Sequence, residues 1–108
     1  MKLNELVDKL ELEVIAGPFE KEVSGIYVGD LLSNVMAKAE KSNIWITVHG
    51  HQNVVAVASL TEVAAVVVVE GLEIEPAAVQ KANAAEVAIL RTAMTGIDLI
   101  RKLIELGV

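Results

Sequence analysis

The stretch Ala65-Val66-Val67-Val68-Val69 carries the clearest β-strand signal in the chain, because four valines follow an alanine without a polar break. Valine favours strands, and an unbroken apolar run indicates a strand that is buried on both faces. Residues 44–48 show the same apolar continuity and predict a second buried strand. Strands of this kind that alternate with helical segments are typical of a parallel sheet in an α/β protein.

The segment between these two strands, residues 52–62, is ambiguous, because its valines favour a strand by propensity. We predict a helix for two reasons. Gln52 or Asn53 can cap a helix after the break at Gly50. Two flanking parallel strands also need a crossover connection, which is usually a helix.

The remaining elements follow from apolar spacing and turn residues. We expect a helix over residues 3–10, strands over 13–16 and 23–28, a helix over 31–39 capped by Asp30, a helix from Pro76 to Glu86, a strand over 87–90, and a last helix capped by Thr95 and ended by Gly107. The strands 13–16 and 23–28 are expected to form a hairpin-like pair. The sequence therefore predicts a mostly parallel central sheet of about five strands that can be mixed at one edge.

The composition limits the class of protein and its partners. The chain has 108 residues, no cysteine and a formal net charge of -6, and its length predicts one domain over residues 1–108. The basic residues are scattered and aromatics are rare, so we expect no nucleic-acid partner. No positively charged leader and no apolar run of ~18 residues is present, so we expect no membrane partner and a cytoplasmic location.

Polar residues gather in three loops that each follow a predicted strand, namely residues 49–53, 70–73 and 91–96. Ligands in open parallel sheets bind outside the carboxyl ends of the strands, so these loops are expected to converge on one ligand-binding rim. The candidate ligand-binding residues are His49, His51, Gln52, Asn53, Glu70, Gly71 and Thr92.

Each candidate has a chemical and a structural interpretation. Backbone N–H groups at Gln52 and Asn53 can bind a phosphate or carboxylate, or the residues can simply cap the helix. His49 and His51 can chelate a metal only if a further ligand such as Glu70 or Asp30 lies close by, and loop hydrogen bonds are the alternative. Glu70-Gly71 can equally be a turn.

Several motifs of enzymes are missing from the sequence. It has no G-x-x-x-x-G-K-[ST] phosphate loop, no G-x-G-x-x-G after a strand and no G-x-S-x-G nucleophile turn. We therefore expect a non-catalytic protein with no cofactor.

Four segments, VSGIYVGD at 23–30, WITV at 45–48, HQNVVAVA at 51–58 and VVVVEGLEIEP at 66–76, together resemble the DRTGG domain family. The resemblance covers nearly the whole chain. In that family an Asp-Arg pair opens the helix after a central strand, and Thr-Gly-Gly follows the next strand. The matching positions here are His51-Gln52 and Val69-Glu70-Gly71, so only Gly71 is retained. The His-Gln-Asn version resembles a stand-alone subgroup of anaerobic bacteria that occurs beside iron-only hydrogenase components.

The resemblance implies a three-layer α/β/α fold similar to the N-terminal domain of HPr kinase/phosphorylase. It also implies a regulatory or ligand-binding module that senses a small anionic metabolite or nucleotide and acts beside a larger enzyme such as an iron-only hydrogenase. The missing phosphate loop argues against a kinase activity.

Two alternatives remain open beside this hypothesis. The last helix has an isoleucine stripe at Ile97, Ile100 and Ile104, which leucines widen, so part of it can face another subunit of a homo-oligomer, most simply a dimer. Such a protein would be an assembly or adaptor protein without a ligand. The third hypothesis is a small metal-binding protein that uses His49 and His51.

Overall fold

The computed structural model describes residues 1–108 and contains five helices and five strands. The helices are α1 (Leu3–Leu10), α2 (Leu32–Lys38), α3 (Asn53–Thr61), α4 (Pro76–Ala85) and α5 (Gly96–Glu105). The strands are β1 (Glu13–Ala16), β2 (Ile26–Val28), β3 (Ile44–Thr47), β4 (Ala65–Val68) and β5 (Ile89–Arg91). None of the helices is long and apolar enough to cross a membrane.

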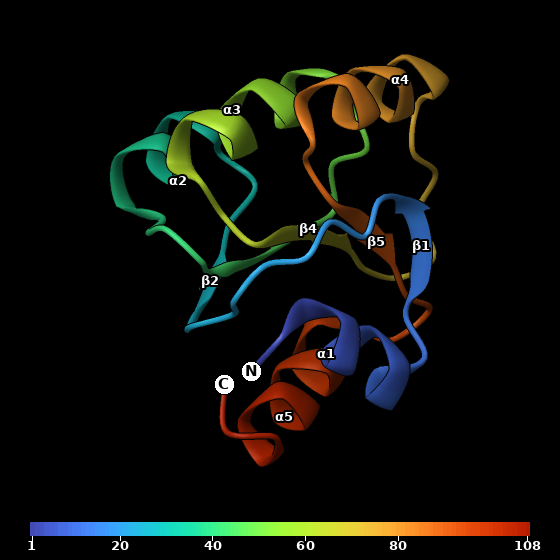
Figure 1. The fold of residues 1–108 in the computed structure, drawn as a ribbon. Coiled ribbons are helices and arrows are strands. Elements are labelled where there is room, and N and C mark those ends of the chain that lie inside the picture. The colour runs from blue at the N-terminus through green and yellow to red at the C-terminus, as the bar shows by residue number, and fades with distance from the viewer.

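The strands form one sheet in the order β1-β5-β4-β3-β2, in which only the β1–β5 pair is antiparallel. Helices α2, α3 and α4 cover one face of the sheet, while α1 and α5 lie side by side on the other (Figure 1). The predicted α/β class, with a mostly parallel five-stranded sheet in three layers, is therefore confirmed.

The continuous apolar strands are explained by burial on both faces of the sheet. Along β4, Val67 packs in the core beneath α1 and α5, whereas Val66 and Val68 pack in the core beneath α2, α3 and α4. All three valines are at most 1% exposed. Because successive strand residues point to opposite faces, a strand covered on both sides needs an apolar residue at every position.

Residues 53–61 form helix α3, so the prediction of a helix in the valine-rich segment is confirmed. Its valines, such as Val54 and Val57, are buried against the sheet. Gln52 occupies the N-cap position of α3, one of the two predicted, but its side chain makes no capping hydrogen bond. His51 provides that contact, since its Nδ1 accepts the N–H of Asn53 at 3.0 Å.

The prediction that the first two strands form a hairpin-like pair was wrong. Strand β1 lies at one edge of the sheet, paired with β5, and β2 lies at the other edge, paired with β3. The second strand is also shorter than predicted and begins at Ile26. Val23 instead donates its N–H to the carbonyl of Met1, so this part of the chain runs along the N-terminus before it reaches the sheet.

Asp30 was expected to cap α2, but this helix has no side-chain cap and begins after Leu31. The Asp30 carboxylate instead accepts the Thr47 hydroxyl at 2.8 Å and the Val48 N–H at 3.0 Å. Thr47 is buried at the end of β3 and needs a partner for its hydroxyl. Asp30 therefore binds the end of β3 instead of capping α2. The cap of α5 is as predicted, because Thr95 Oγ1 accepts the N–H of Asp98 at 3.2 Å.

Candidate functional site

The three polar loops lie along the edge of the sheet formed by the carboxyl ends of the parallel strands. The N–H of Glu75 donates to the carbonyl of Gly50 at 2.9 Å and joins the loops after β3 and β4. The N–H of Glu70 donates to the backbone carbonyl of Met94 at 2.9 Å, and the N–H of Gly71 donates to the backbone carbonyl of Thr92 at 2.8 Å. These two bonds join the loops after β4 and β5, so the expected convergence on one rim is confirmed.

Gly50 is the point of closest approach along this rim. A Cβ at this position would overlap the carbonyl oxygen of Glu73 and would contact the Cα of Ile74. Both atoms belong to the backbone, so no side chain can turn aside to make room. The short distance between the two loops therefore depends on a residue without a Cβ.

The start of α3 is already in contact with a carboxylate of the chain itself. Glu75 Oε1 accepts the N–H of Gln52 at 3.3 Å. Because Nδ1 of His51 accepts the Asn53 N–H, the neutral imidazole carries its proton on Nε2, which lies 3.9 Å from the same Glu75 oxygen. Glu75 thus lies where an anionic ligand of this helix end would bind, and such a ligand would have to replace it.

Three of the predicted ligand-binding residues come together in a hollow of about 320 Å³ beside this helix end. His49, His51 and Asn53 supply its polar groups, and Leu32 and Val54 supply apolar surface. Both imidazoles are exposed, whereas Val54 is buried. The hollow therefore combines an apolar wall with hydrogen-bonding groups at its margin.

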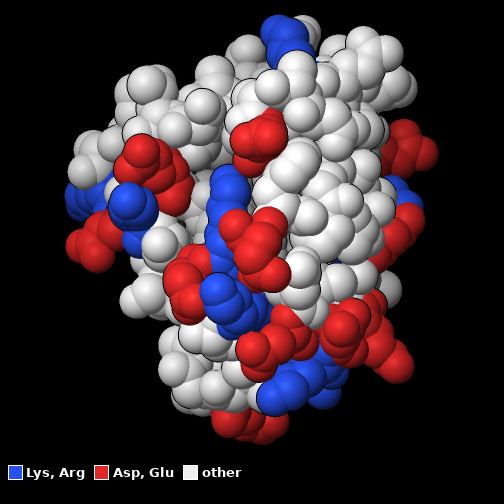
Figure 2. All heavy atoms as spheres, in the orientation of Figure 1, with Lys and Arg blue, Asp and Glu red and all other residues white.

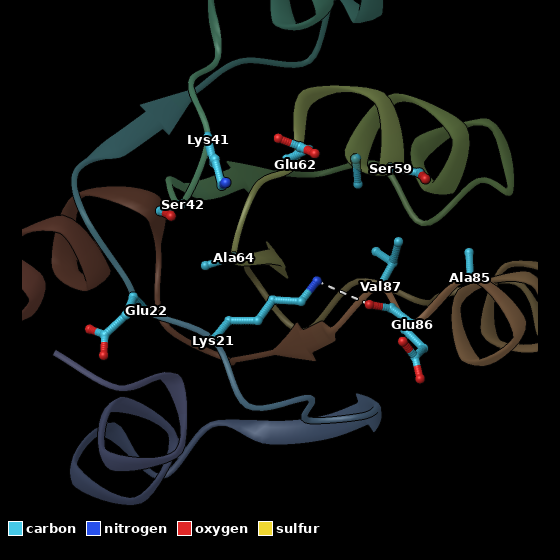
Figure 3. Close-up of a pocket in the computed structure, with 11 residues that line it drawn as sticks. Lys21, Glu22, Lys41, Ser42, Ser59, Glu62, Ala64, Ala85, Glu86 and Val87 are labelled. Carbon is cyan, nitrogen blue, oxygen red and sulfur yellow. Dashed lines mark hydrogen bonds between the residues drawn. The ribbon is translucent and has the colours of Figure 1, made fainter.

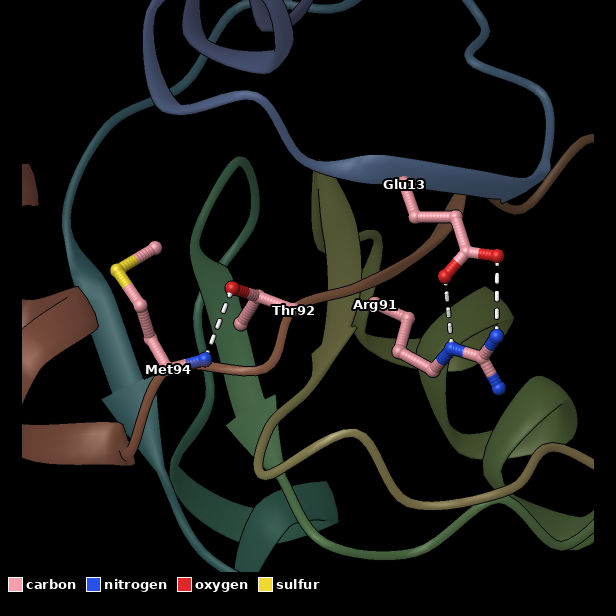
Figure 4. A network of polar contacts seen from close by, with 4 residues as sticks. All are labelled: Glu13, Arg91, Thr92 and Met94. Carbon is pink, nitrogen blue, oxygen red and sulfur yellow. Dashed lines mark hydrogen bonds and ion pairs between the residues drawn. The ribbon is translucent and has the colours of Figure 1, made fainter.

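Thr92 lines a different hollow, of about 480 Å³, between β5, the C-terminal end of α1 and helix α5. Its hydroxyl accepts the N–H of Met94 at 3.2 Å (Figure 4). Three basic residues, Lys9, Arg91 and Lys102, line the same hollow.

Arg91 is committed to an ion pair in that hollow. Its guanidinium binds both carboxylate oxygens of Glu13 on the neighbouring strand β1, at 2.8 and 3.0 Å (Figure 4). These hydrogen bonds lower the pKa of the Glu13 carboxyl and raise the pKa of Arg91. The pair therefore joins β1 to β5 and leaves Lys9 and Lys102 as the uncommitted cations of this hollow.

The remaining predicted residues have mainly backbone roles. Glu70 and Gly71 both adopt positive φ, and their N–H groups are bonded to the loop after β5. Their interpretation as a turn is therefore correct. Gln52 lies partly in a third hollow between α3 and α4. The structure thus places His49, His51 and Asn53 in one hollow, Thr92 in a second and Gln52 in a third, whereas Glu70 and Gly71 lie in the loop after β4 and line none of them.

The histidines do not acquire the further ligands that a metal site needs. No group of three or more His, Asp or Glu side chains in the chain lies close enough to hold a metal ion. Asp30, considered as a further ligand, is bonded to Thr47 and Val48 instead.

The sequence analysis did not predict a hollow of about 390 Å³ at the end of the sheet opposite the carboxyl ends of the parallel strands. It lies near the C-terminal ends of α3 and α4. Lys21 donates to the carbonyl of Glu86 at 3.0 Å, and Lys41 and Glu62 lie across the hollow from it (Figure 3). Acidic and basic side chains are interspersed over the face of the molecule in Figure 2. The lining residues come from separate segments, so no local sequence motif could have revealed this hollow.

No protein-family model and no curated protein sequence matches the chain. A solved structure similar to it is that of the CBS and DRTGG domains of the regulatory region of Clostridium perfringens pyrophosphatase, complexed with the activator diadenosine tetraphosphate. The two share 14% sequence identity and superpose with a TM-score of 0.71, over 92% of this chain and 44% of the other. The chain therefore spans less than half of that regulatory region. This likeness shows that the chain shares a fold with part of the region, which is consistent with the DRTGG-like fold expected from its sequence.

Proposed function

We propose that residues 1–108 form one DRTGG-like domain that acts as a non-catalytic regulatory module and binds a small nucleotide or another small anionic metabolite. The observation that carries this proposal is the hollow lined by His49, His51 and Asn53 at the carboxyl ends of the strands. Ligands of open α/β sheets bind at this edge. The fold is shared with a regulatory region that was solved with a nucleotide activator, which supports the choice of ligand class.

The chemistry of the hollow suits a flat polar ring better than a bare phosphate. Leu32 and Val54 offer apolar surface, while the Asn53 amide can both donate and accept hydrogen bonds at the edge of a base. A volume of about 320 Å³ is at the small end of the range for ligand pockets, so one base or one small metabolite is the expected occupant.

The anionic part of the ligand would compete with Glu75 at the N-terminus of α3. Glu75 holds the Gln52 N–H and faces His51, so it both fills the anion position and repels a second negative charge. Glu75→Gln is therefore expected to bind an anionic ligand several-fold more tightly than the native chain. An unchanged affinity would mean that the anion does not approach this helix end.

Isothermal titration calorimetry with AMP, ATP and diadenosine tetraphosphate tests the proposal directly. We expect a measurable affinity for at least one of them and a loss of about tenfold or more in Asn53→Ala, the size expected when a binding hydrogen bond to a ligand is removed. Thr92→Ala is the matched control, because Thr92 lines the other hollow. No heat with any of the three ligands, or equal losses in both variants, would contradict the proposal.

The regulated enzyme is a separate part of the proposal. We propose that the module acts in the cytoplasm beside a larger enzyme such as an iron-only hydrogenase, as the His51-Gln52-Asn53 version of the family resemblance implies. Affinity capture of the tagged chain from an anaerobic bacterial lysate is expected to recover a hydrogenase subunit. Recovery without any such subunit would contradict this partner and would leave the ligand-binding proposal to its own test.

A homo-oligomeric assembly protein without a ligand is the second candidate. It is favoured by α5, where Leu99 and Leu103 are buried against the sheet while Ile97 and Ile104 are 61% and 62% exposed. Ile97 and Ile104 are about two helical turns apart and therefore lie on one side of the helix. Light scattering that finds a dimer which Ile104→Lys abolishes, together with no response to nucleotides, would favour this candidate.

A further inference from the structure

The outer edge of β2 is an unpaired strand edge in the middle of an uncharged segment. Strand β2 is the last strand of the sheet on its side and has one neighbour, β3. Its residues Ile26, Tyr27 and Val28 are flanked by Gly25 and Gly29, so the segment has neither a charge nor a proline. Proteins protect a strand edge with charged residues, a proline, a bulge or a very short strand, and of these devices β2 has only its length of three residues.

The register of the β2–β3 ladder shows which backbone groups face outward. The Ile44 N–H donates to Gly25 and the Gly29 N–H donates to Ile46, which directs alternate residues of the strand toward β3. Tyr27 lies between these two bonds and has both of its backbone groups on the β3 side. The N–H and C=O groups of Ile26 and Val28 therefore point to the open edge.

From this pattern we propose that β2 pairs antiparallel with β2 of a second copy of the chain, about a two-fold axis at Tyr27. In that register Ile26 of each copy lies opposite Val28 of the other. Each of these two pairs exchanges both of its outward N–H···O=C bonds, so the four free donors and four free acceptors of the edges are all satisfied. The result is a continuous sheet of ten strands.

The side chains and charges at this edge also fit a second copy. Ile26 is half-buried and Val28 is 54% exposed, and both point to the face covered by α1 and α5, so pairing places one against the other across the axis. Leu31, directly after the strand, is 63% exposed. Although the chain carries a net charge of -6, two uncharged edges meet without like-charge repulsion at the contact.

The contact is short, so the dimer is expected to be weak. Stable interfaces bury about 800 Å² per partner, more than a three-residue strand and its flanking side chains supply. We therefore expect light scattering to give a monomer at micromolar concentration and a mass that rises toward the dimer near ~1 mM, as a dissociation constant in the upper micromolar range predicts.

Three single-lysine variants identify the surface. Val28→Lys places a charge on the proposed edge and is expected to raise the dimer dissociation constant at least tenfold. Val14→Lys is the matched control on β1, where the residue is 38% exposed, and Ile104→Lys tests the exposed side of α5. Both should leave the dimer unchanged. A chain that stays monomeric at ~1 mM, or a dimer lost in Ile104→Lys but kept in Val28→Lys, would overturn the proposal.

Amide hydrogen exchange gives a readout that does not depend on any variant folding correctly. At high concentration the Ile26 and Val28 amides of the native chain should become protected, while the Tyr27 amide, which already faces β3, should change little. Equal exchange of the Ile26 and Val28 amides in dilute and concentrated samples would also overturn the proposal.

Discussion

The two edge strands of the sheet, β1 and β2, differ in charge and in regularity. Strand β1 is antiparallel, contains a bulge between Val14 and Ala16, and carries the ion pair between Glu13 and Arg91. Strand β2 is parallel and uncharged, and the indole N–H of Trp45 on the neighbouring strand β3 donates to the carbonyl of Gly29, just after β2, at 2.9 Å. A charged and irregular edge strand disfavours pairing with a strand of another chain, whereas a regular apolar edge strand favours it.

The same difference separates an edge held by buried packing from an edge supported at the surface. Trp45 is fully buried in the core under α2, α3 and α4, and it lies opposite Tyr27 in the ladder. Glu13 and Arg91 lie at the surface, where ion pairs contribute little to stability. Substitutions on the β2 side should therefore have larger effects than those on the β1 side.

Trp45→Ala is expected to give the largest effect. It removes a fully buried ring of β3 and leaves the Gly29 carbonyl without its partner, so the unfolding free energy should fall by about 3–5 kcal/mol. Urea denaturation followed by circular dichroism measures this loss. Trp45→Phe is the control, because it keeps an aromatic ring and should lose less. A loss below about 1 kcal/mol in the alanine variant would show that Trp45 does not anchor this edge.

Asp30→Ala should give an intermediate effect on the same side of the sheet. It leaves the buried Thr47 hydroxyl and the Val48 N–H without their acceptor, which costs about 1–3 kcal/mol. Chemical denaturation of Asp30→Ala beside Asp8→Ala provides the comparison, because Asp8 is an exposed residue of α1. Equal stability of the two variants would contradict the role assigned to Asp30.

Glu13→Gln should give the smallest effect and should reveal itself in the pH dependence. The hydrogen bonds from Arg91 lower the pKa of Glu13 in the folded chain below its ordinary value of 4.5. A carboxyl with a lowered folded pKa stabilises the protein above its unfolded pKa, and that stability is lost as the pH falls through the folded pKa. The native chain should therefore lose more stability on acidification from pH 7 than Glu13→Gln does.

The measurement for this comparison is the urea midpoint at a series of pH values from neutral to strongly acidic. Glu22 has a pKa lowered chiefly by its hydrogen bond with Lys2, so part of the acid sensitivity should remain in Glu13→Gln. Identical pH profiles of the native chain and Glu13→Gln would show that the pair does not support the β1 edge.

The candidate site could be predicted only in part. From the rule that ligands bind at the carboxyl ends of parallel strands, we correctly predicted that the three loops lie along one rim. It could not show that His49 and Thr92 line different hollows, because that depends on how far apart β3 and β5 lie across β4. The hydrogen bond from the Gln52 N–H, at the start of α3, to Glu75 could not be predicted either, because these two residues are 23 positions apart.

The sequence by itself determined the helices, the parallel strands and the double burial of β3 and β4, because these follow from local spacing and from unbroken apolar runs. Only the tertiary structure decided that β1 leaves its neighbour in sequence and pairs with β5 at the far edge. It also decided that Asp30 serves Thr47 instead of its own helix. Short strands and single polar side chains have several local partners of similar energy, so the choice among them is made by the packing of the whole chain.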